Sequence, residues 1–279
     1  MRKFKLINGN GAEFDLNSPF HFLQNPDGLG LAREITSAQA GYDFIEVKNE
    51  PVQKMPSGEI AFKRQTAYAK YQEFVRFCAV PPLVLCYMPL SKWHYIDVEL
   101  QSIGKGELDR TARRLICPVS FLGLSTWYEA KKSYEVQSSE AEGKIYPYTY
   151  PYTYRETAAG NKEINNTGFE ASPCIIHIFG EVVNPSWSLL VDGVSVLTGG
   201  VDVTIPAGNK LVVNSSPKDM EIAEYSADGE YVADRYQNSD FSKARFIMAP
   251  PGRSVLSFTH EGAGEISVVV EVKQLADSV

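Results

Sequence analysis

Short runs of alternating or wholly apolar residues, separated by turn residues, make up most of the chain. Between Tyr95 and Ser102, apolar residues alternate with Asp97, Glu99 and Gln101. Because successive side chains of a strand point to opposite faces, this pattern predicts a strand with one dry and one solvated face. Apolar runs predict two more strands in the first half of the chain, at Leu83–Met88 and Arg114–Tyr128.

Two hairpins are predicted near the start of the chain. Phe4–Ile7 and Glu13–Leu16 flank an Asn-Gly-Asn-Gly segment. Asn and Gly tolerate the positive φ that tight hairpin turns require, so this signal is strong. A second hairpin is expected between Tyr42–Val52 and Ile60–Arg64, across Pro56-Ser57-Gly58.

One helix is expected over Thr66–Val80, because its apolar residues recur at helical spacing and Pro81-Pro82 then ends it. Phe77 falls outside the apolar stripe. It is a candidate contact for a partner subunit, and the alternative is that it packs beneath a loop. The expected buried stripe consists of Tyr68, Tyr71, Phe74, Val75 and Cys78.

The second half of the chain reads as all-β. About seven short strands separated by turn signals are typical of a β-sandwich. They are expected at Cys174–Phe179, Trp187–Val191, Val201–Ile205, Lys210–Asn214, Glu221–Tyr225, Arg253–Phe258 and Ile266–Val272.

A tandem Pro-Tyr-Thr-Tyr repeat marks the division between the two halves. Proline lacks an N–H and biases the residue before it towards extended backbone, so an extended connector is expected there. We therefore predict an N-terminal domain over residues 1–132, a Tyr/Pro-rich linker over 133–165 and a C-terminal domain over 166–279.

Composition and charge exclude several classes of protein. The 279 residues are 44% hydrophobic and 22% charged, which is ordinary for globular domains. No apolar stretch is long enough to span a membrane as a helix. The net charge is −7 and lies almost wholly after residue 144, so the chain offers no basic footprint for nucleic acid. The four cysteines sit in apolar runs, which indicates buried, reduced thiols.

Chemistry-bearing motifs are absent from the sequence. The four histidines are dispersed, no pair has zinc-ligand spacing, and neither a nucleophile elbow nor a P-loop occurs. We expect no enzyme, no catalytic residue, no metal and no cofactor. Glycosidase carboxylate pairs come from distant positions, so the sequence leaves that one class open.

The order of several short motifs resembles the distal tail (Dit) proteins, the siphovirus-type tail component family of phages that infect Gram-positive bacteria. The motifs run over nearly the whole length of the chain. They are the opening hairpin Phe4–Gly11, the helix Tyr68–Cys78 leading into Leu83–Pro89, the element Ser102–Glu107, the strand Phe121–Trp127, the linker Tyr146–Tyr150, the segment Asn166–Phe169 and the segment Gly180–Pro185.

This resemblance implies a mainly β fold with one helix, in which a split-barrel-like N-terminal domain carries the helix. The C-terminal domain would be a β-sandwich of galectin or jelly-roll type. It also implies a homo-hexamer, as one ring or two stacked rings, at the virion tail tip or baseplate. The ring would join the major tail tube protein to a tail-associated lysin, tail fibre or receptor-binding protein. DNA would pass through without specific binding, no membrane would be involved, and synthesis would occur in the host cytoplasm.

Lys105 and Glu107 are candidates for the subunit interface, together with Phe77. Gly106 permits a tight turn that carries their opposite charges, which would help to fix the register of neighbouring subunits. The alternative is an exposed turn that contributes less than about 1 kcal/mol.

A glycan-binding adhesion module is the alternative function for this fold class. Sandwich domains bind sugars through aromatic rings and polar or acidic side chains. The candidate contacts are Trp187, Tyr225, Tyr231 and Tyr236, although Trp187 is equally placed to be a core residue at the start of a strand.

Overall fold

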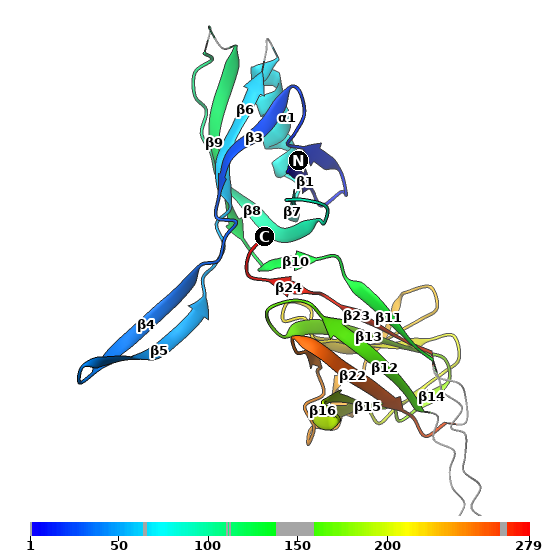
Figure 1. Ribbon diagram of the computed structural model, residues 1–279. Helices are drawn as coiled ribbons and strands as arrows, with labels where there is room; N and C mark the ends of the chain where they lie inside the picture. Colours follow the sequence, from blue (N-terminus) through cyan, green and yellow to red (C-terminus); the bar gives the residue numbers. More distant parts are fainter. Residues whose placement is uncertain (1, 64–65, 110, 112, 138–158, 263–266) are drawn as a thin grey trace, which may run out of the picture. The chain divides into compact units, whose positions relative to one another are not determined.

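The computed structural model describes residues 2–63, 66–109, 111, 113–137, 159–262 and 267–279 (Figure 1). The chain divides into two compact units. The first contains Met1–Ala130 and Leu275–Val279, and the second contains Lys131–Gln274. The second unit is therefore inserted into the first, and the last five residues return to the unit in which the chain began.

In the described part of the first unit, nine strands form one sheet. Seven follow the order β2-β1-β7-β8-β9-β6-β3, while β10 pairs with both β8 and β24. Their bounds are β1 (Lys3–Ile7), β2 (Glu13–Asp15), β3 (His21–Asp27), β6 (Ser57–Lys63), β7 (Leu83–Met88), β8 (His94–Ile103), β9 (Arg114–Gly123), β10 (Trp127–Glu129) and β24 (Leu275–Ala276).

The opening hairpin is confirmed, since Leu6 of β1 pairs with Phe14 of β2. The alternation predicted for Tyr95–Ser102 is also found in β8, where Ile96 and Val98 are buried and Glu99 is exposed. These local patterns succeed because one face of each strand packs on the core of the unit.

The predicted helix is α1 (Ala67–Cys78), but its buried face is narrower than expected. Phe74 is fully buried, and its ring centroid lies 5.3 Å from Phe14 and 6.2 Å from Phe62. Tyr68 and Val75, which were expected in the buried stripe, are exposed. At 100° per residue, Tyr68 and Val75 lie along one edge of the predicted stripe, so this edge remains outside the core.

The second predicted hairpin is wrong. The segment after Tyr42 forms β5 (Asp43–Pro51), which pairs with β4 (Arg33–Ala40) and not with β6. β6 lies between β3 and β9 in the main sheet. Figure 1 shows β4 and β5 as a separate two-stranded ribbon that extends from the sheet of the first unit.

The second unit is built from two larger sheets and one small one within the residues that the structure describes. The larger orders are β11-β23-β13-β18-β19-β20, with β21 beside β13, and β12-β22-β15-β16. The bounds are β11 (Lys132–Gln137), β12 (Ala159–Asn166), β13 (Ser172–Phe179), β14 (Val182–Val183), β15 (Ser186–Val191), β16 (Val194–Gly200), β17 (Thr204–Ile205), β18 (Lys210–Asn214), β19 (Glu221–Tyr225), β20 (Tyr231–Asp234), β21 (Met248–Ala249), β22 (Gly252–Thr259) and β23 (Ser267–Val272). A short 3₁₀ helix, η1 (Tyr236–Asn238), lies between β20 and β21.

One buried apolar cluster joins these sheets, so the fold is the expected mainly β arrangement with a sandwich-type second unit. The cluster draws Ile176 and Ile178 from β13, Leu189 from β15 and Leu256 from β22. The predicted strands Lys210–Asn214 and Glu221–Tyr225 agree with β18 and β19 to the residue.

The boundaries between the units differ from the predicted ranges. The division falls after Ala130, and the described parts of the predicted 133–165 linker are strands β11 and β12 of the second unit. Residues 138–158, which include the Pro-Tyr-Thr-Tyr repeat, lie outside the described residues. Leu275–Val279, expected in the C-terminal domain, belongs to the first unit. Among the described residues, no helix is long and apolar enough to cross a membrane.

Candidate assembly interface

The β4–β5 hairpin, called the arm from here on (residues 33–51), is a regular antiparallel ribbon. Its pairing runs from Arg33 with Pro51 to Ala40 with Asp43, interrupted by one irregularity after Thr36. The two strands are joined by Gly41 and Tyr42 alone, and Gly41 has a φ of +69°. Two-residue hairpin turns need positive φ at this position, which glycine adopts without steric cost.

The arm exposes large apolar side chains on both faces. Phe44 is 71% exposed and its neighbour Ile45 is 57% exposed. Adjacent residues of a strand point to opposite faces, so neither face of the ribbon is covered. Ile35, Tyr42 and Val47 are exposed as well.

Surface apolar residues are ordinary when they are scattered, but here they are concentrated on one ribbon with no core of its own. An isolated two-stranded hairpin is marginally stable in water. The charged side chains add a little support, since Lys48 Nζ lies 2.9 Å from Glu34 Oε2 and 3.2 Å from Glu50 Oε2. Exposed pairs of this kind contribute less than about 1 kcal/mol. The arm is therefore the part of the first unit most in need of a covering surface.

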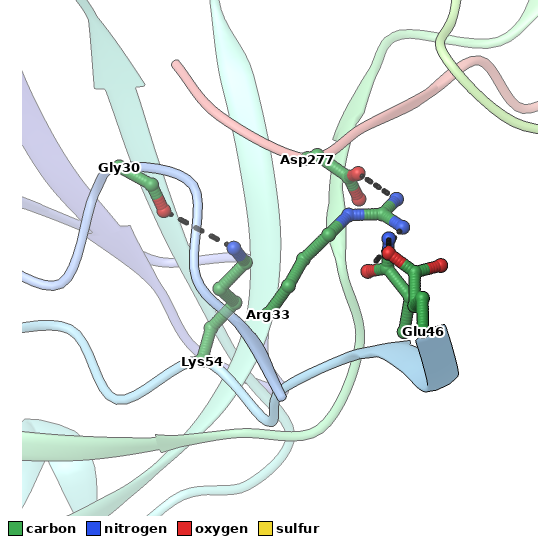
Figure 2. Close-up of polar contacts among 6 residues, drawn as sticks. Gly30, Arg33, Glu46, Lys54 and Asp277 are labelled. Carbon is green, nitrogen blue, oxygen red and sulfur yellow. Dashed lines mark hydrogen bonds and ion pairs between the residues drawn. The ribbon is translucent and has the colours of Figure 1, made fainter. Parts of the chain in front are cut away.

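Polar contacts hold the base of the arm (Figure 2). The Arg33 guanidinium donates through Nη2 to Asp277 Oδ2 at 2.8 Å and through Nη1 to Asn49 Oδ1 at 3.3 Å. Asn49 Nδ2 in turn donates to Glu46 Oε2 at 3.3 Å. Just beyond the arm, the buried Lys54 donates to the Gly30 carbonyl at 3.1 Å. The Arg33–Asp277 bond ties the arm to the body of the unit, and the Arg33–Asn49 bond links its two strands at the base.

The end of the chain supplies part of this anchor. In β24, Ala276 pairs with Trp127 of β10. The Val279 amide donates to the carbonyl of Leu29 at 3.3 Å, and Asp277 is 8% exposed. The last five residues therefore bind the segment that leads into the arm.

The predicted interface residues lie elsewhere on the first unit. Lys105 and Glu107 are both exposed, and Lys105 Nζ lies 5.4 Å from the ring centroid of Tyr68 and 5.8 Å from that of Tyr71. Phe77 is half-buried and packs against the core of its own unit, with its ring centroid 5.4 Å from Phe14. Much of the Phe77 surface is thus used within the chain.

The predicted glycan contacts divide into two groups. Trp187 is 3% exposed and its Nε1 donates to the Arg245 carbonyl at 3.0 Å, so it is a core residue. Tyr225 and Tyr231 are brought together, with ring centroids 5.9 Å apart at an interplanar angle of 84°. Tyr236 and Tyr231 line the same surface hollow.

The histidine and cysteine side chains of the described residues are all at least partly buried. No cluster of three or more His, Cys, Asp or Glu side chains that could hold a metal is present there. His177 Nε2 lies 3.8 Å from Glu271 Oε1, and burial lowers the pKa of His177. The four cysteines are free and buried, and burial raises the pKa of Cys78, Cys86 and Cys174 to about 12. Such thiols are poor nucleophiles at neutral pH.

Sequence reasoning missed the arm, although a weak signal exists. Gly41 stands between two segments that can both extend, and the pair Gly41-Tyr42 has the length of a tight turn. Hydrophobic periodicity gives no help because no residue of the arm is buried.

Comparison with known proteins places this geometry in context. Residues 3–124 match the family model described as the distal tail protein N-terminal domain. A chain of the phage P2 baseplate in its activated conformation with Ca has a TM-score of 0.65 and 16% identity, over 100% of both chains. The SPP1 Dit protein, described as a paradigm of the hub adsorption apparatus in phages that infect Gram-positive bacteria, has a TM-score of 0.65 and 10% identity over 98% of this chain and 99% of that one. At these identities the two structures share the fold with this chain. No curated protein sequence matches it.

Proposed function

Residues 3–124 form a distal tail protein N-terminal domain, and from this premise we propose that the chain is a structural hub subunit that closes into a six-membered ring at a phage tail tip. The ring acts by assembly and has no catalytic role. It stands in the virion between the tail tube and the adsorption apparatus.

The arm is the observation that carries this proposal. It exposes Phe44 and Ile45 on opposite faces, and its own unit covers neither. In a ring, each subunit meets its neighbours through two different patches, because a cyclic interface is heterologous. An arm that projects from one subunit and lies on the next satisfies this geometry and removes its apolar surface from water.

The receiving surface is proposed to include Lys105 and the exposed Tyr68. The arm carries four carboxylates against two basic side chains, so it is acidic overall. Lys105 stands over the Tyr68 ring and gives the neighbouring surface a positive, partly apolar character. Glu107, two residues after Lys105 in the chain, would set the register of the contact.

The neighbours of the ring are proposed from the same premise. The major tail tube protein would stack on one face, and a tail-associated lysin, tail fibre or receptor-binding protein would bind the other. The nearly balanced charge of residues 1–144 suits a passage for DNA, because tight phosphate binding needs clustered Lys and Arg.

Light scattering over a concentration series, with negative-stain imaging of the same fractions, tests the ring. Six chains of 31.0 kDa give 6 × 31.0 = 186 kDa, and two stacked rings give twice that mass. A monomer at every concentration up to about 1 mM, without rings in the images, contradicts the proposal.

Variants distinguish a specific role of the arm in ring assembly from the general effect of removing exposed apolar side chains. Phe44→Ser with Ile45→Ser should abolish the ring while leaving the melting temperature of the monomer unchanged, since neither side chain is buried within the chain. Val194→Ser with Val196→Ser is the matched control, because these valines are also exposed on one strand, β16. A Lys105→Ala, Glu107→Ala double variant that assembles normally would remove both residues from the interface.

A further inference from the structure

The second unit has a hollow of about 480 Å³ over β19 and β20. Glu221, Tyr231, Asp234 and Tyr236 line it, and it is called the tyrosine groove from here on. β20 is the last strand of its sheet, so the groove lies at a sheet edge. Pockets that combine aromatic rings with a few convergent polar groups are the usual form of small-molecule sites.

Tyr231 gives the groove an open aromatic surface. Its side chain is 60% exposed, and the ring meets Tyr225 in an edge-to-face contact at 5.9 Å. The contact restrains the Tyr231 ring and leaves most of the side chain in solvent. A flat, partly held ring of this kind can stack against an apolar ligand face at low entropic cost.

Tyr236 forms the second aromatic wall and is fixed from behind. Its ring stacks on Phe246 at 6.3 Å with an interplanar angle of 22°, and the Phe241 ring meets it edge-on at 5.6 Å. The Arg245 guanidinium carbon lies 5.3 Å from the Tyr236 ring centroid. These contacts restrain the Tyr236 ring, which also lines the groove.

Two carboxylates that line the groove together with the tyrosines provide hydrogen-bond acceptors. Glu221 Oε2 accepts from the Tyr225 hydroxyl at 3.0 Å, and Asp234 Oδ1 accepts from the Tyr236 amide at 2.8 Å. A carboxylate has about four lone-pair positions, so each group keeps capacity for further donors. The bonds to the chain orient both carboxylates before any ligand binds.

An ion pair on the opposite side of the strands holds the groove in shape. Glu224 is buried and accepts from Arg235 Nε at 3.0 Å and from Asn209 Nδ2 at 2.6 Å. Arg235 directly follows β20, so the pair ties the edge strand to β19. The burial of Glu224 and the two guanidinium donors to its Oε2 atom make this link stronger than a surface ion pair.

We propose that the tyrosine groove binds a neutral saccharide. Sugars present apolar C–H faces that stack on tyrosine rings and hydroxyls that donate to carboxylates, and the groove offers both partners side by side. Anionic polymers are disfavoured because Glu221 and Asp234 face the ligand and most of the net negative charge of the chain lies after residue 144. Trp187, buried in the core, plays no part in this site.

Binding to the full chain is measured by isothermal titration and saturation-transfer NMR. The probes are the neutral tetrasaccharides of cellulose, chitin and maltose, with tetragalacturonate as the anionic comparison. At least one neutral probe should bind, and the acidic probe should bind at least about tenfold more weakly. If no neutral probe binds at about 10 mM, or if the acidic probe binds best, the proposal is overturned.

Three variants tie the binding to the groove. Tyr231→Ala should weaken the best neutral probe by about tenfold or more, and Asp234→Asn by several-fold. Phe169→Ala is the control, because Phe169 is 71% exposed in the same unit and does not line the groove. Equal affinity for Tyr231→Ala and Phe169→Ala would place the sugar elsewhere and overturn the assignment. Ring assembly does not enter this measurement, so its outcome is independent of the hub proposal.

Discussion

Arg33 Nη2 lies 2.8 Å from Asp277 Oδ2, which joins the first residue of the arm to the third-last residue of the chain. The Asp277 side chain is 11% exposed and that of Arg33 is 28% exposed. Charge-assisted bonds with one largely buried partner are stronger than surface pairs, so this contact is a principal fixing point for the direction in which the arm leaves its unit.

Replacing Asp277 should loosen the base of the arm. In Asp277→Asn the Arg33 bond loses its charge assistance, and we expect local opening of residues 33–51 to become easier by about 1–2 kcal/mol. Amide hydrogen exchange of the arm peptides measures this change. The control is Lys48→Gln, because the Lys48 pairs are exposed on the same arm and should contribute within about 0.5 kcal/mol. Equal exchange in the two variants would show that Asp277 does not anchor the arm.

A glycine in the second unit should resist substitution because of the indole opposite it. A Cβ on Gly199 would lie 2.5 Å from Trp187 Cε2 and 2.8 Å from the Arg245 carbonyl oxygen. Gly199→Ala should therefore lower the free energy of unfolding of the second unit by about 1–3 kcal/mol. The neighbouring Gly200→Ala is a matched control, since its Cβ would meet nothing closer than 3.5 Å. Calorimetry of both variants tests the difference, and a stable Gly199→Ala would place the Trp187 ring elsewhere.

The Glu224–Arg235 pair should make the stability of the second unit depend on pH. Burial raises the pKa of Glu224, but hydrogen bonds from Asn209 and Arg235 outweigh it, so the net pKa lies below its ordinary value of 4.5. A lowered folded-state pKa contributes stability above the unfolded value, and this contribution is lost as the pH falls through the folded value.

Glu224→Gln should thus destabilise β19 and β20 by about 2 kcal/mol at pH 7, because the Gln side chain cannot carry the charge that Arg235 faces. At about pH 3 the difference from the parent chain should shrink, since the parent carboxylate is itself becoming protonated. Hydrogen exchange of peptides from β19 measures both values. A gap between the two proteins that is as wide at low pH as at pH 7 would contradict the ionic account.

Local patterns predicted the elements that have one buried face, and long-range contacts decided the rest. Leu6 and Phe14 pair as the Asn-Gly turn predicts, because the signal and the structure lie in the same dozen residues. The arm was not predicted because hydrophobic periodicity reports burial within the chain, and no residue of the arm is buried. The return of Asp277 to Arg33 could not be predicted because it joins positions 244 residues apart.

The tyrosine groove shows the same limit for a site. Residue type alone made Tyr231 and Tyr236 candidates for sugar contact, and both line the groove. Trp187 differs from these tyrosines because of strand parity: it is buried in the core, whereas its neighbours Ser186 and Ser188 in β15 are only partly buried. Glu221 and Asp234 were missed since acidic residues at strand ends are common, and only the pairing of β19 with β20 brings them together.

Substitution of Phe77 tests whether this residue packs within its own unit or contacts a neighbouring subunit. Its ring lies 5.4 Å from Phe14 and it is partly buried against the core, so Phe77→Ala removes packing within the first unit. We expect the monomer to lose about 2 kcal/mol of stability, which is less than the cost of deleting a fully buried phenylalanine. Thermal unfolding in dilute solution, where the chain is monomeric, measures this loss. Replacing a residue that acts only at the interface would instead leave the stability of the monomer unchanged and weaken the ring. Comparison with Phe44→Ser, whose side chain is 71% exposed, distinguishes the two roles in one experiment.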